Sequence, residues 1–200
     1  AFCAVRLIFF VVRKMEEGQI ESGFRHGQTV TACLVALSHG TNDAQKTMGI
    51  ITLTLIAVGF QPSGTGPELW VVAICGLAIA LGTYMGGWRV IRTLGKGLTE
   101  ISTPQGFAAE AASATTILVS SHMGFALSTT QVCSGSIIGT GLGKKGSKVN
   151  WGVAGKMLIA WIVTFPAAGI VGALACALAK TSVWGTVAVA FIACAVAFII

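Results

Sequence analysis

The sequence predicts an all-α polytopic membrane protein with broken or re-entrant helices, and three observations indicate this fold class. Its 200 residues are 54% hydrophobic and only 10% charged. Their mean hydropathy is +0.82. The polar residues gather in short stretches between long apolar runs. Soluble globular chains carry about a quarter charged residues. This composition therefore excludes a soluble enzyme, a nucleic-acid-binding module and a disordered tail.

The polar stretches divide the chain into six apolar segments. We expect membrane segments at residues 1–12, 29–60, 69–88, 106–143, 153–179 and 183–200. A helix needs roughly 20 apolar residues to cross a bilayer. Because both ends of the chain are apolar, we interpret residues 1–12 as the end of a span. We also expect the sequence to be a fragment of a longer membrane protein.

The distribution of Lys and Arg predicts which loops face the cytoplasm. These residues concentrate at 13–27, 89–105 and 144–148, whereas residues 61–68 contain neither. Cytoplasmic loops of membrane proteins carry an excess of Lys and Arg. We therefore place the three basic stretches in the cytoplasm and residues 61–68 outside. The net charge of +6 follows from these loops and does not indicate nucleic-acid binding.

Two of the segments have lengths that do not suit regular spans. Residues 106–143 leave from and return to the cytoplasm in about 38 residues, or roughly 57 Å of helix. That is barely two crossings of a core about 30 Å thick, which predicts a hairpin of short or re-entrant helices. Residues 29–60 are longer than one crossing requires, so we expect that segment to be interrupted.

A polar cluster lies in the middle of 29–60, where residues His39–Gly49 read HGTNDAQKTMG. A charge at the bilayer centre costs about 2.5–3.5 kcal/mol. Asp43 and Lys46 are i,i+3 neighbours and can neutralise each other. Residues 40–43 also predict a helix start, with a glycine break followed by capping side chains. The free N–H groups of such a start would bind an anion.

A second polar cluster lies in the deepest part of the predicted hairpin, where residues 120–131 read SSHMGFALSTTQ. Its hydroxyls and amide can donate to phosphate-like oxygens or offer oxygen ligands to a cation. The alternative is that each hydroxyl bonds back to the i−4 carbonyl of a packed helix. Because Ser128, Thr129, Thr130 and Gln131 stand together at a predicted turn, we favour a site.

These two clusters resemble the signatures of one family. The stretch His39–Gly49 resembles the signature of the inorganic phosphate transporter (PiT) family. Residues 107–110 (FAAE) and 128–136 (STTQVCSGS) are similar to its second conserved block. The resemblance extends from about residue 20 to near the end of the chain. It implies one half of an inverted-repeat transporter, in which two halves each carry both motifs. Only one copy of each is present, so the chain resembles the C-terminal half.

The resemblance also implies roles for individual residues. The substrate- and ion-binding candidates match the two motifs: Thr41, Asn42, Asp43, Gln45, Lys46, Ser128, Thr129 and Thr130. Candidate coupling or relay residues are His39, Glu110 and Gln131, the last of which replaces a histidine common in the family. We expect no enzymatic cofactor, no resident metal and no catalytic residue.

The pair of residues 45–46 is most similar to the bacterial low-affinity branch. Similarity to that branch implies proton-coupled import of phosphate, either as the free ion or as a neutral complex with a divalent metal. Other branches of the family use sodium as the coupling ion. The implied partners are inorganic phosphate, a coupling cation, the N-terminal half of the transporter, the lipid bilayer and a second copy in a homodimer. The implied location is a bacterial inner or plasma membrane, with multiple spans.

Three other interpretations of the polar clusters remain open. An ion channel or another anion permease could use the same hairpin, although a channel should show polar faces along several spans. A membrane enzyme could use His39, Asp43 or His122, but no nucleophile and base stand at a recognisable spacing. His39 and Asp43, at i,i+4, could also hold a transition metal, although the sequence supplies no third ligand.

Overall fold

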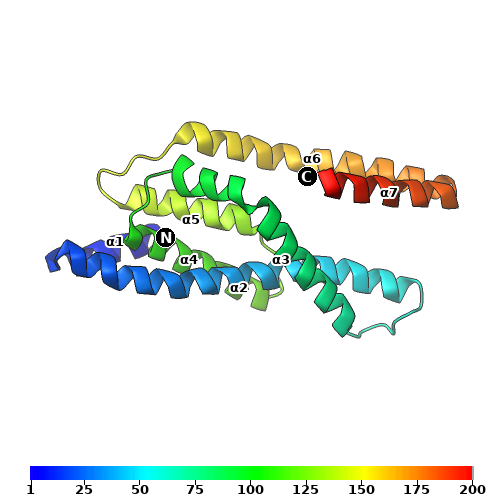
Figure 1. The fold of residues 1–200 in the computed structure, drawn as a ribbon, viewed down its shortest axis with the longest axis horizontal. Coiled ribbons are helices and arrows are strands. Elements are labelled where there is room, and N and C mark those ends of the chain that lie inside the picture. Colours follow the sequence, from blue (N-terminus) through cyan, green and yellow to red (C-terminus); the bar gives the residue numbers. More distant parts are fainter. Residues whose placement is uncertain (200) are drawn as a thin grey trace. The chain divides into compact units, whose positions relative to one another are not determined.

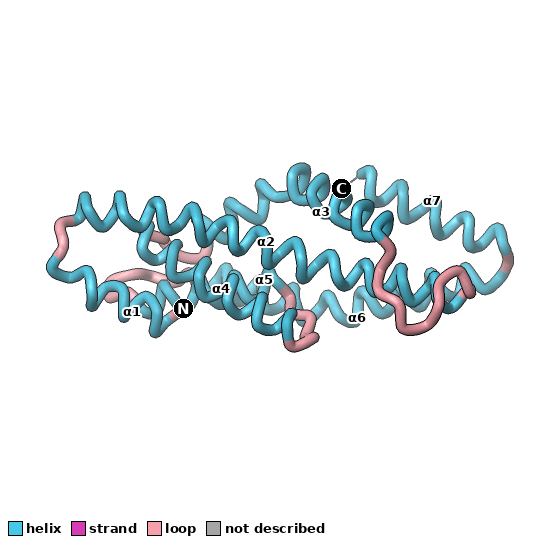
Figure 2. Tube along the Cα trace, turned by 90° about the horizontal axis from the view of Figure 1, so that it is seen from below, coloured by secondary structure: helices cyan, strands magenta, loops and turns pink. Residues whose placement is uncertain are grey.

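The structure is a computed structural model that describes residues 1–199, with the side chains of all of them except Glu17, Arg89 and residues 197–199. It divides into two compact units, residues 1–150 and 151–200. Helices account for every regular element of the described residues, and Figures 1 and 2 show their course. The predicted all-helical class is confirmed, whereas the re-entrant helices and the inverted repeat remain predictions.

The first unit contains five α-helices and two short helical turns. The helices are α1 (Phe2–Val11), α2 (Glu17–Ala57), α3 (Leu69–Arg92), α4 (Thr103–His122) and α5 (Thr129–Gly143). A 3-10 turn, η1 (Val12–Lys14), follows α1, and a π-helical turn, η2 (Thr93–Gly97), follows α3. Helix α4 packs against α2 and against α5, while α1 packs against α5 and α4.

Helix α2 differs from the prediction in two ways. It is unbroken over 41 residues, so the expected interruption of 29–60 at residues 40–43 is wrong for this structure. It also begins at Glu17, within the stretch 13–27 that we assigned to a loop. Phe24 explains part of the early start, because its ring packs edge-on against Phe107 of α4, with the ring centroids 5.3 Å apart.

Helices α4 and α5 form a helical hairpin within the segment predicted at 106–143. The backbone N–H and the hydroxyl of Ser102 both donate to Oε1 of Gln105, at 3.0 and 2.8 Å, which caps the start of α4. The chain turns at Gly124, whose φ of 80° lies in the left-handed region that favours glycine. Residues 125–128 are not helical. The helical segments are thus interrupted between α4 and α5 and not within α2.

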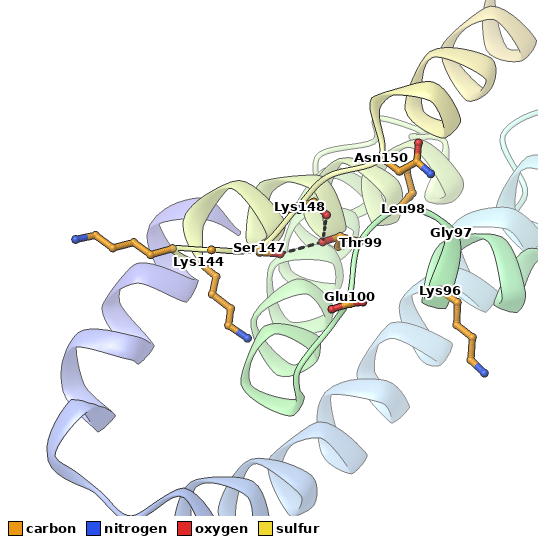
Figure 3. Close-up of a pocket in the computed structure, with 11 residues that line it drawn as sticks. Lys96, Gly97, Leu98, Thr99, Glu100, Lys144, Ser147, Lys148 and Asn150 are labelled. Atoms are coloured by element: carbon orange, nitrogen blue, oxygen red, sulfur yellow. Dashed lines mark hydrogen bonds between the residues drawn. The ribbon is translucent and has the colours of Figure 1, made fainter.

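The loop before α4 is joined to the loop after α5. The hydroxyl of Thr99 contacts the Ser147 hydroxyl and donates to the Lys148 carbonyl, both at 3.0 Å (Figure 3). Thr99 and Val149 form an antiparallel bridge, and the Asn150 N–H donates to the Leu98 carbonyl at 2.8 Å. These bonds hold together the two ends of the hairpin.

The second unit is a pair of packed apolar helices, α6 (Trp151–Thr181) and α7 (Val183–Ile199). Their boundaries lie close to the predicted 153–179 and 183–200, of which residue 200 lies outside the described residues. In the described chain, two helices are long and apolar enough to cross a membrane, residues 69–88 of α3 and residues 151–181 of α6. Residues 183–196 of α7 form a shorter apolar stretch.

The contact between α1 and α5 depends on a glycine. A Cβ added at Gly143 would overlap the Val5 side chain and would stand 3.0 Å from the Phe2 carbonyl oxygen. We expect Gly143→Ala in the full-length protein to lower stability by about 1–3 kcal/mol, because overpacking shifts one helix against the other. Thermal melting in detergent measures this effect.

Gly135 is the matched control in the same helix, since a Cβ there meets nothing within 4 Å. Gly135→Ala should leave the melting temperature unchanged or raise it, because alanine is the better helix former by up to about 1 kcal/mol. Equal effects of the two substitutions would contradict the proposed contact.

Candidate functional site

The candidate site lies where the middle of α2 meets the turn between α4 and α5. Its central amide belongs to Asn42, whose side chain is buried. The Asn42 Nδ2 donates to the Leu127 carbonyl at 2.8 Å and to Oδ1 of Asp43 at 3.0 Å. The Leu127 carbonyl is open to such donors because it belongs to the non-helical residues 125–128.

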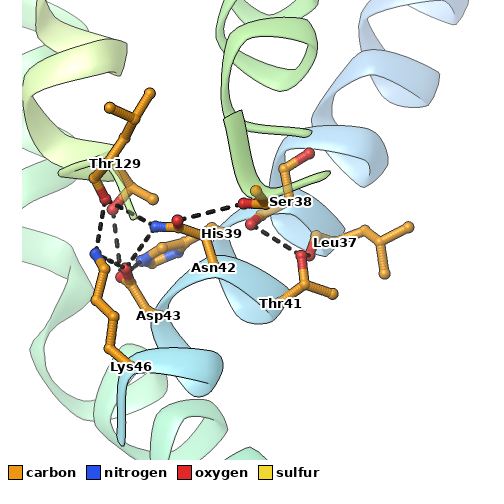
Figure 4. Close-up of polar contacts among 10 residues, drawn as sticks. Leu37, Ser38, His39, Thr41, Asn42, Asp43, Lys46 and Thr129 are labelled. Atoms are coloured by element: carbon orange, nitrogen blue, oxygen red, sulfur yellow. Dashed lines mark hydrogen bonds and ion pairs between the residues drawn. The ribbon is translucent and has the colours of Figure 1, made fainter. Parts of the chain in front are cut away.

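Four donors surround the carboxylate of Asp43. Nζ of Lys46 and Nδ2 of Asn42 each lie 3.0 Å from Oδ1. Nε2 of His39 lies 2.9 Å from Oδ2, and the hydroxyl of Thr129 donates to the same oxygen at 3.3 Å. Figure 4 shows the four side chains pointing toward this carboxylate. Because 30% of the Asp43 side chain is exposed, small ions have access to it.

Lys46 links the two parts of the site. Its Nζ donates to the Leu127 carbonyl at 2.6 Å as well as to Oδ1 of Asp43. Asn42 and Lys46 lie one helical turn apart on α2, so both reach the same carbonyl. The lysine thus neutralises Asp43, as one reading of the sequence suggested, and also binds the turn to α2.

The start of α5 supplies the helix N-terminus at the site. We predicted such a terminus at residues 40–43, and the structure has it at Thr129 instead. The Thr129 side chain is buried and directs its hydroxyl to Asp43. The Ser128 side chain precedes it at the N-cap position and makes no capping hydrogen bond.

Several predicted site residues lie beside the cluster without joining its hydrogen bonds. The Thr41 hydroxyl bonds back to the carbonyls of Leu37, at 2.9 Å, and Ser38, at 3.1 Å, as Figure 4 shows. The remaining ones have exposed side chains, namely Gln45, Ser128, Thr130 and Gln131. For these five residues, as for those of the cluster, a binding role remains a prediction.

Glu110 lies at a separate place, about 18 Å along α4 from His122. Its Oε2 accepts a hydrogen bond from the Thr31 hydroxyl of α2 at 2.7 Å. Glu110 also lines a cavity of about 580 Å³, together with Gln28, Ser113 and Cys133. The relay role of Glu110 is therefore a prediction for a second location and not for the Asp43 cluster.

Two participants in the site were not predicted from the sequence. The Ser121 hydroxyl of α4 donates to Oδ1 of Asn42 at 3.3 Å. The Leu127 carbonyl accepts from both Asn42 and Lys46. The serine belongs to the polar cluster 120–131. The carbonyl could be inferred only from the combination of Gly124 with a helix start at 129, which leaves the intervening carbonyls without helical partners.

The arrangement is suited to binding an anion beside a titratable or cation-binding carboxylate. An ammonium, an amide N–H, a hydroxyl and an imidazole converge on one small region, and the Asp43 carboxylate occupies its centre. Charge-assisted hydrogen bonds of this type are stronger than neutral ones. Among the described residues, no group of three or more His, Cys, Asp or Glu side chains is placed to hold a metal ion.

Comparisons with known proteins point to one family. The family described as "Phosphate transporter family" matches residues 5–172. A Mycobacterium tuberculosis protein named "Probable low-affinity inorganic phosphate transporter" is 57% identical over 168 residues, which are 84% of this chain and 40% of that protein. A Rhizobium meliloti protein of the same name is 41% identical over 174 residues, 87% of this chain and 52% of that protein.

A solved structure is also similar. It is described as "The sodium-dependent phosphate transporter", with a TM-score of 0.66 and 28% sequence identity. The similarity covers 80% of this chain and 42% of that chain. This chain therefore spans between two fifths and about half of the length of the proteins it matches. The relatives are named as transporters, in agreement with our expectation of a protein that is not an enzyme.

Proposed function

The chain belongs to the phosphate transporter family, and from this premise we propose that the full protein carries inorganic phosphate across the bacterial cell membrane by secondary active transport. The observation that carries the proposal is the convergence of Lys46, Asn42 and Thr129 on one small region between α2 and the α4–α5 turn. Such a set of donors matches the oxygens of an oxyanion. Relatives named as phosphate transporters support phosphate as that oxyanion.

The chain is proposed to be the C-terminal half of an inverted-repeat transporter. The chain covers about half of the length of a relative, which supports this assignment. In such transporters the substrate lies between two halves, near the bilayer midplane, against broken helices. The hairpin of α4 and α5 is then the re-entrant element, and the N-terminal half completes the phosphate site. The exposed side of the Asp43 cluster is the side available to that half.

The contacts of Asp43 suggest how a cation and phosphate are coupled. In the present arrangement the Asp43 carboxylate accepts hydrogen bonds from the donors that would bind phosphate. It thus serves as an internal stand-in for the substrate anion. A proton or cation on Asp43 weakens the hydrogen bonds from Lys46 and Thr129 to its carboxylate, because the charge that attracts these donors is neutralised. Lys46 and Thr129 are then free to donate to phosphate. Binding of the cation and binding of the anion thereby favour each other.

We propose the proton as the coupling ion, with phosphate carried as the free ion or as a neutral complex with a divalent metal. The imidazole of His39, 2.9 Å from Asp43, supports this choice, because a histidine ring can both donate and accept a proton. Sodium is the second candidate, since the similar solved structure is described as sodium-dependent. In that case sodium, and not a proton, binds the Asp43 carboxylate.

Uptake by the full-length protein in proteoliposomes tests both the transport and its coupling. Under an inward proton gradient in sodium-free buffer, we expect radiolabelled phosphate to accumulate above its external concentration. Collapse of the gradient by a protonophore should abolish this accumulation. Accumulation that requires sodium and ignores the protonophore would replace the proton by sodium. Absence of phosphate uptake under both gradients would refute transport itself.

A further inference from the structure

A second concentration of positive charge lies far along the chain from the Asp43 cluster, at the end of α5. Lys144 is half-buried there. Its Nζ lies 3.4 Å from the Ser102 hydroxyl and 3.4 Å from Oε1 of Gln105, both uncharged oxygens. It also lies 5.6 Å from the centre of the Phe9 ring. Both ion pairs found among the described side chains belong to Asp43, so neither neutralises Lys144.

The pocket beside Lys144 combines positive charge with apolar surface. It has a volume of about 470 Å³ and lies between α1 and the end of α5. Its described lining residues include three cations and no acid: Arg6, Phe9, Phe10, Gly143, Lys144 and Lys145. Arg6 and Lys145 are exposed, as is 64% of Phe10. An anion with an attached hydrocarbon chain satisfies both parts of this lining.

Two neighbouring pockets that also include Lys144 are poorer anion sites, because one contains Glu21 and the other, shown in Figure 3, contains Glu100. In the pocket of Figure 3, the side chain of Lys96 also extends away from the other lysines. A carboxylate within a pocket opposes a second negative charge. The acid-free pocket at Arg6, Lys144 and Lys145 is therefore the one whose charge complements an anion.

The location favours a lipid as the source of the anion. Residues 13–27 and 144–148 are the basic stretches that the sequence places on the cytoplasmic side. The cytoplasmic leaflet carries anionic lipids, and basic pockets between helices on that side bind their headgroups. We propose that this pocket binds the headgroup phosphate of one anionic phospholipid through Arg6, Lys144 and Lys145.

Native mass spectrometry of the full-length transporter, titrated with phosphatidylglycerol or phosphatidylcholine, tests the proposal. We expect one phosphatidylglycerol to bind at least about thirtyfold more tightly than phosphatidylcholine. Arg6→Gln and Lys145→Gln should each weaken phosphatidylglycerol binding about fivefold, and the double variant about thirtyfold. Both side chains are exposed, so these variants leave the folded core intact. Lys144→Gln adds a third variant, in which glutamine can still bond to Ser102.

The matched control is Lys14→Gln, which removes one exposed cation from the same predicted side but outside this pocket. It should leave the affinity for phosphatidylglycerol unchanged. Equal affinities for the two lipids, or equal losses in Lys14→Gln and Lys145→Gln, would overturn the proposal. Inorganic phosphate is the third probe. Displacement of phosphatidylglycerol by an equal concentration of inorganic phosphate would assign the pocket to free phosphate and also overturn it.

Discussion

Asp43→Asn in the full-length transporter is expected to reduce concentrative phosphate uptake to about a hundredth of the unaltered level. Asparagine keeps the size of the side chain but removes the charge that holds Lys46 at 3.0 Å and His39 at 2.9 Å. The coupling cation loses its anionic ligand, and a loss of about 3 kcal/mol in its binding accounts for that factor. Uptake of radiolabelled phosphate, normalised to the amount of transporter in the membrane, measures the effect.

The stand-in role of Asp43 makes this prediction more specific. Without the carboxylate, the donors Lys46 and Thr129 are free for phosphate, while the cation loses its site. Asp43→Asn should therefore still exchange internal for external phosphate, although it no longer accumulates it. Glu68→Gln is a matched control, since Glu68 lies outside this cluster and bonds to Trp70 at 2.6 Å. Loss of exchange together with uptake would show that Asp43 serves binding, and full uptake would remove Asp43 from the mechanism.

Hydropathy predicted the helices that have apolar side chains on every side. Helices α3 and α6 each contain a window apolar enough to cross a membrane, so composition alone locates them. Their boundaries differ from the predicted 69–88 and 153–179 by a few residues. The start of helix α2 was harder to predict, because its first turns are polar and contacts with α4 contribute part of their stability. The contact of Phe24 with Phe107 is one example of such tertiary support.

Four polar side chains of the cluster, His39, Asn42, Asp43 and Lys46, were predicted together with Thr129, whereas Ser121 and the backbone around the cluster were not. A glycine followed by Thr41 and Asn42 indicates a helix start when only local bonds are considered. In the structure Thr41 bonds back to Leu37 within the helix, and Asn42 finds its acceptor in Leu127. A partner so distant along the chain leaves no local pattern in the sequence. The juxtaposition of Asp43 with Thr129, at 3.3 Å, is the feature that the predicted permease site required.

Thr129→Val is expected to lower phosphate uptake about 10- to 100-fold, because a hydrogen bond to a charged group contributes about 1.5–3 kcal/mol. Valine has the shape of threonine without its hydroxyl, so the buried side chain stays packed while the donor to Asp43 is lost. Thr129→Ala should give a similar or larger loss of uptake, and Thr129→Ser, which restores the donor, should retain uptake within about threefold.

The control is Thr116→Ala, since Thr116 is exposed on the same hairpin and bonds back to Ala112 at 2.8 Å. If Thr129→Ser is as inactive as Thr129→Val, packing of the methyl group, and not the hydroxyl, makes Thr129 necessary. Full activity of Thr129→Val would exclude the start of α5 from the phosphate site.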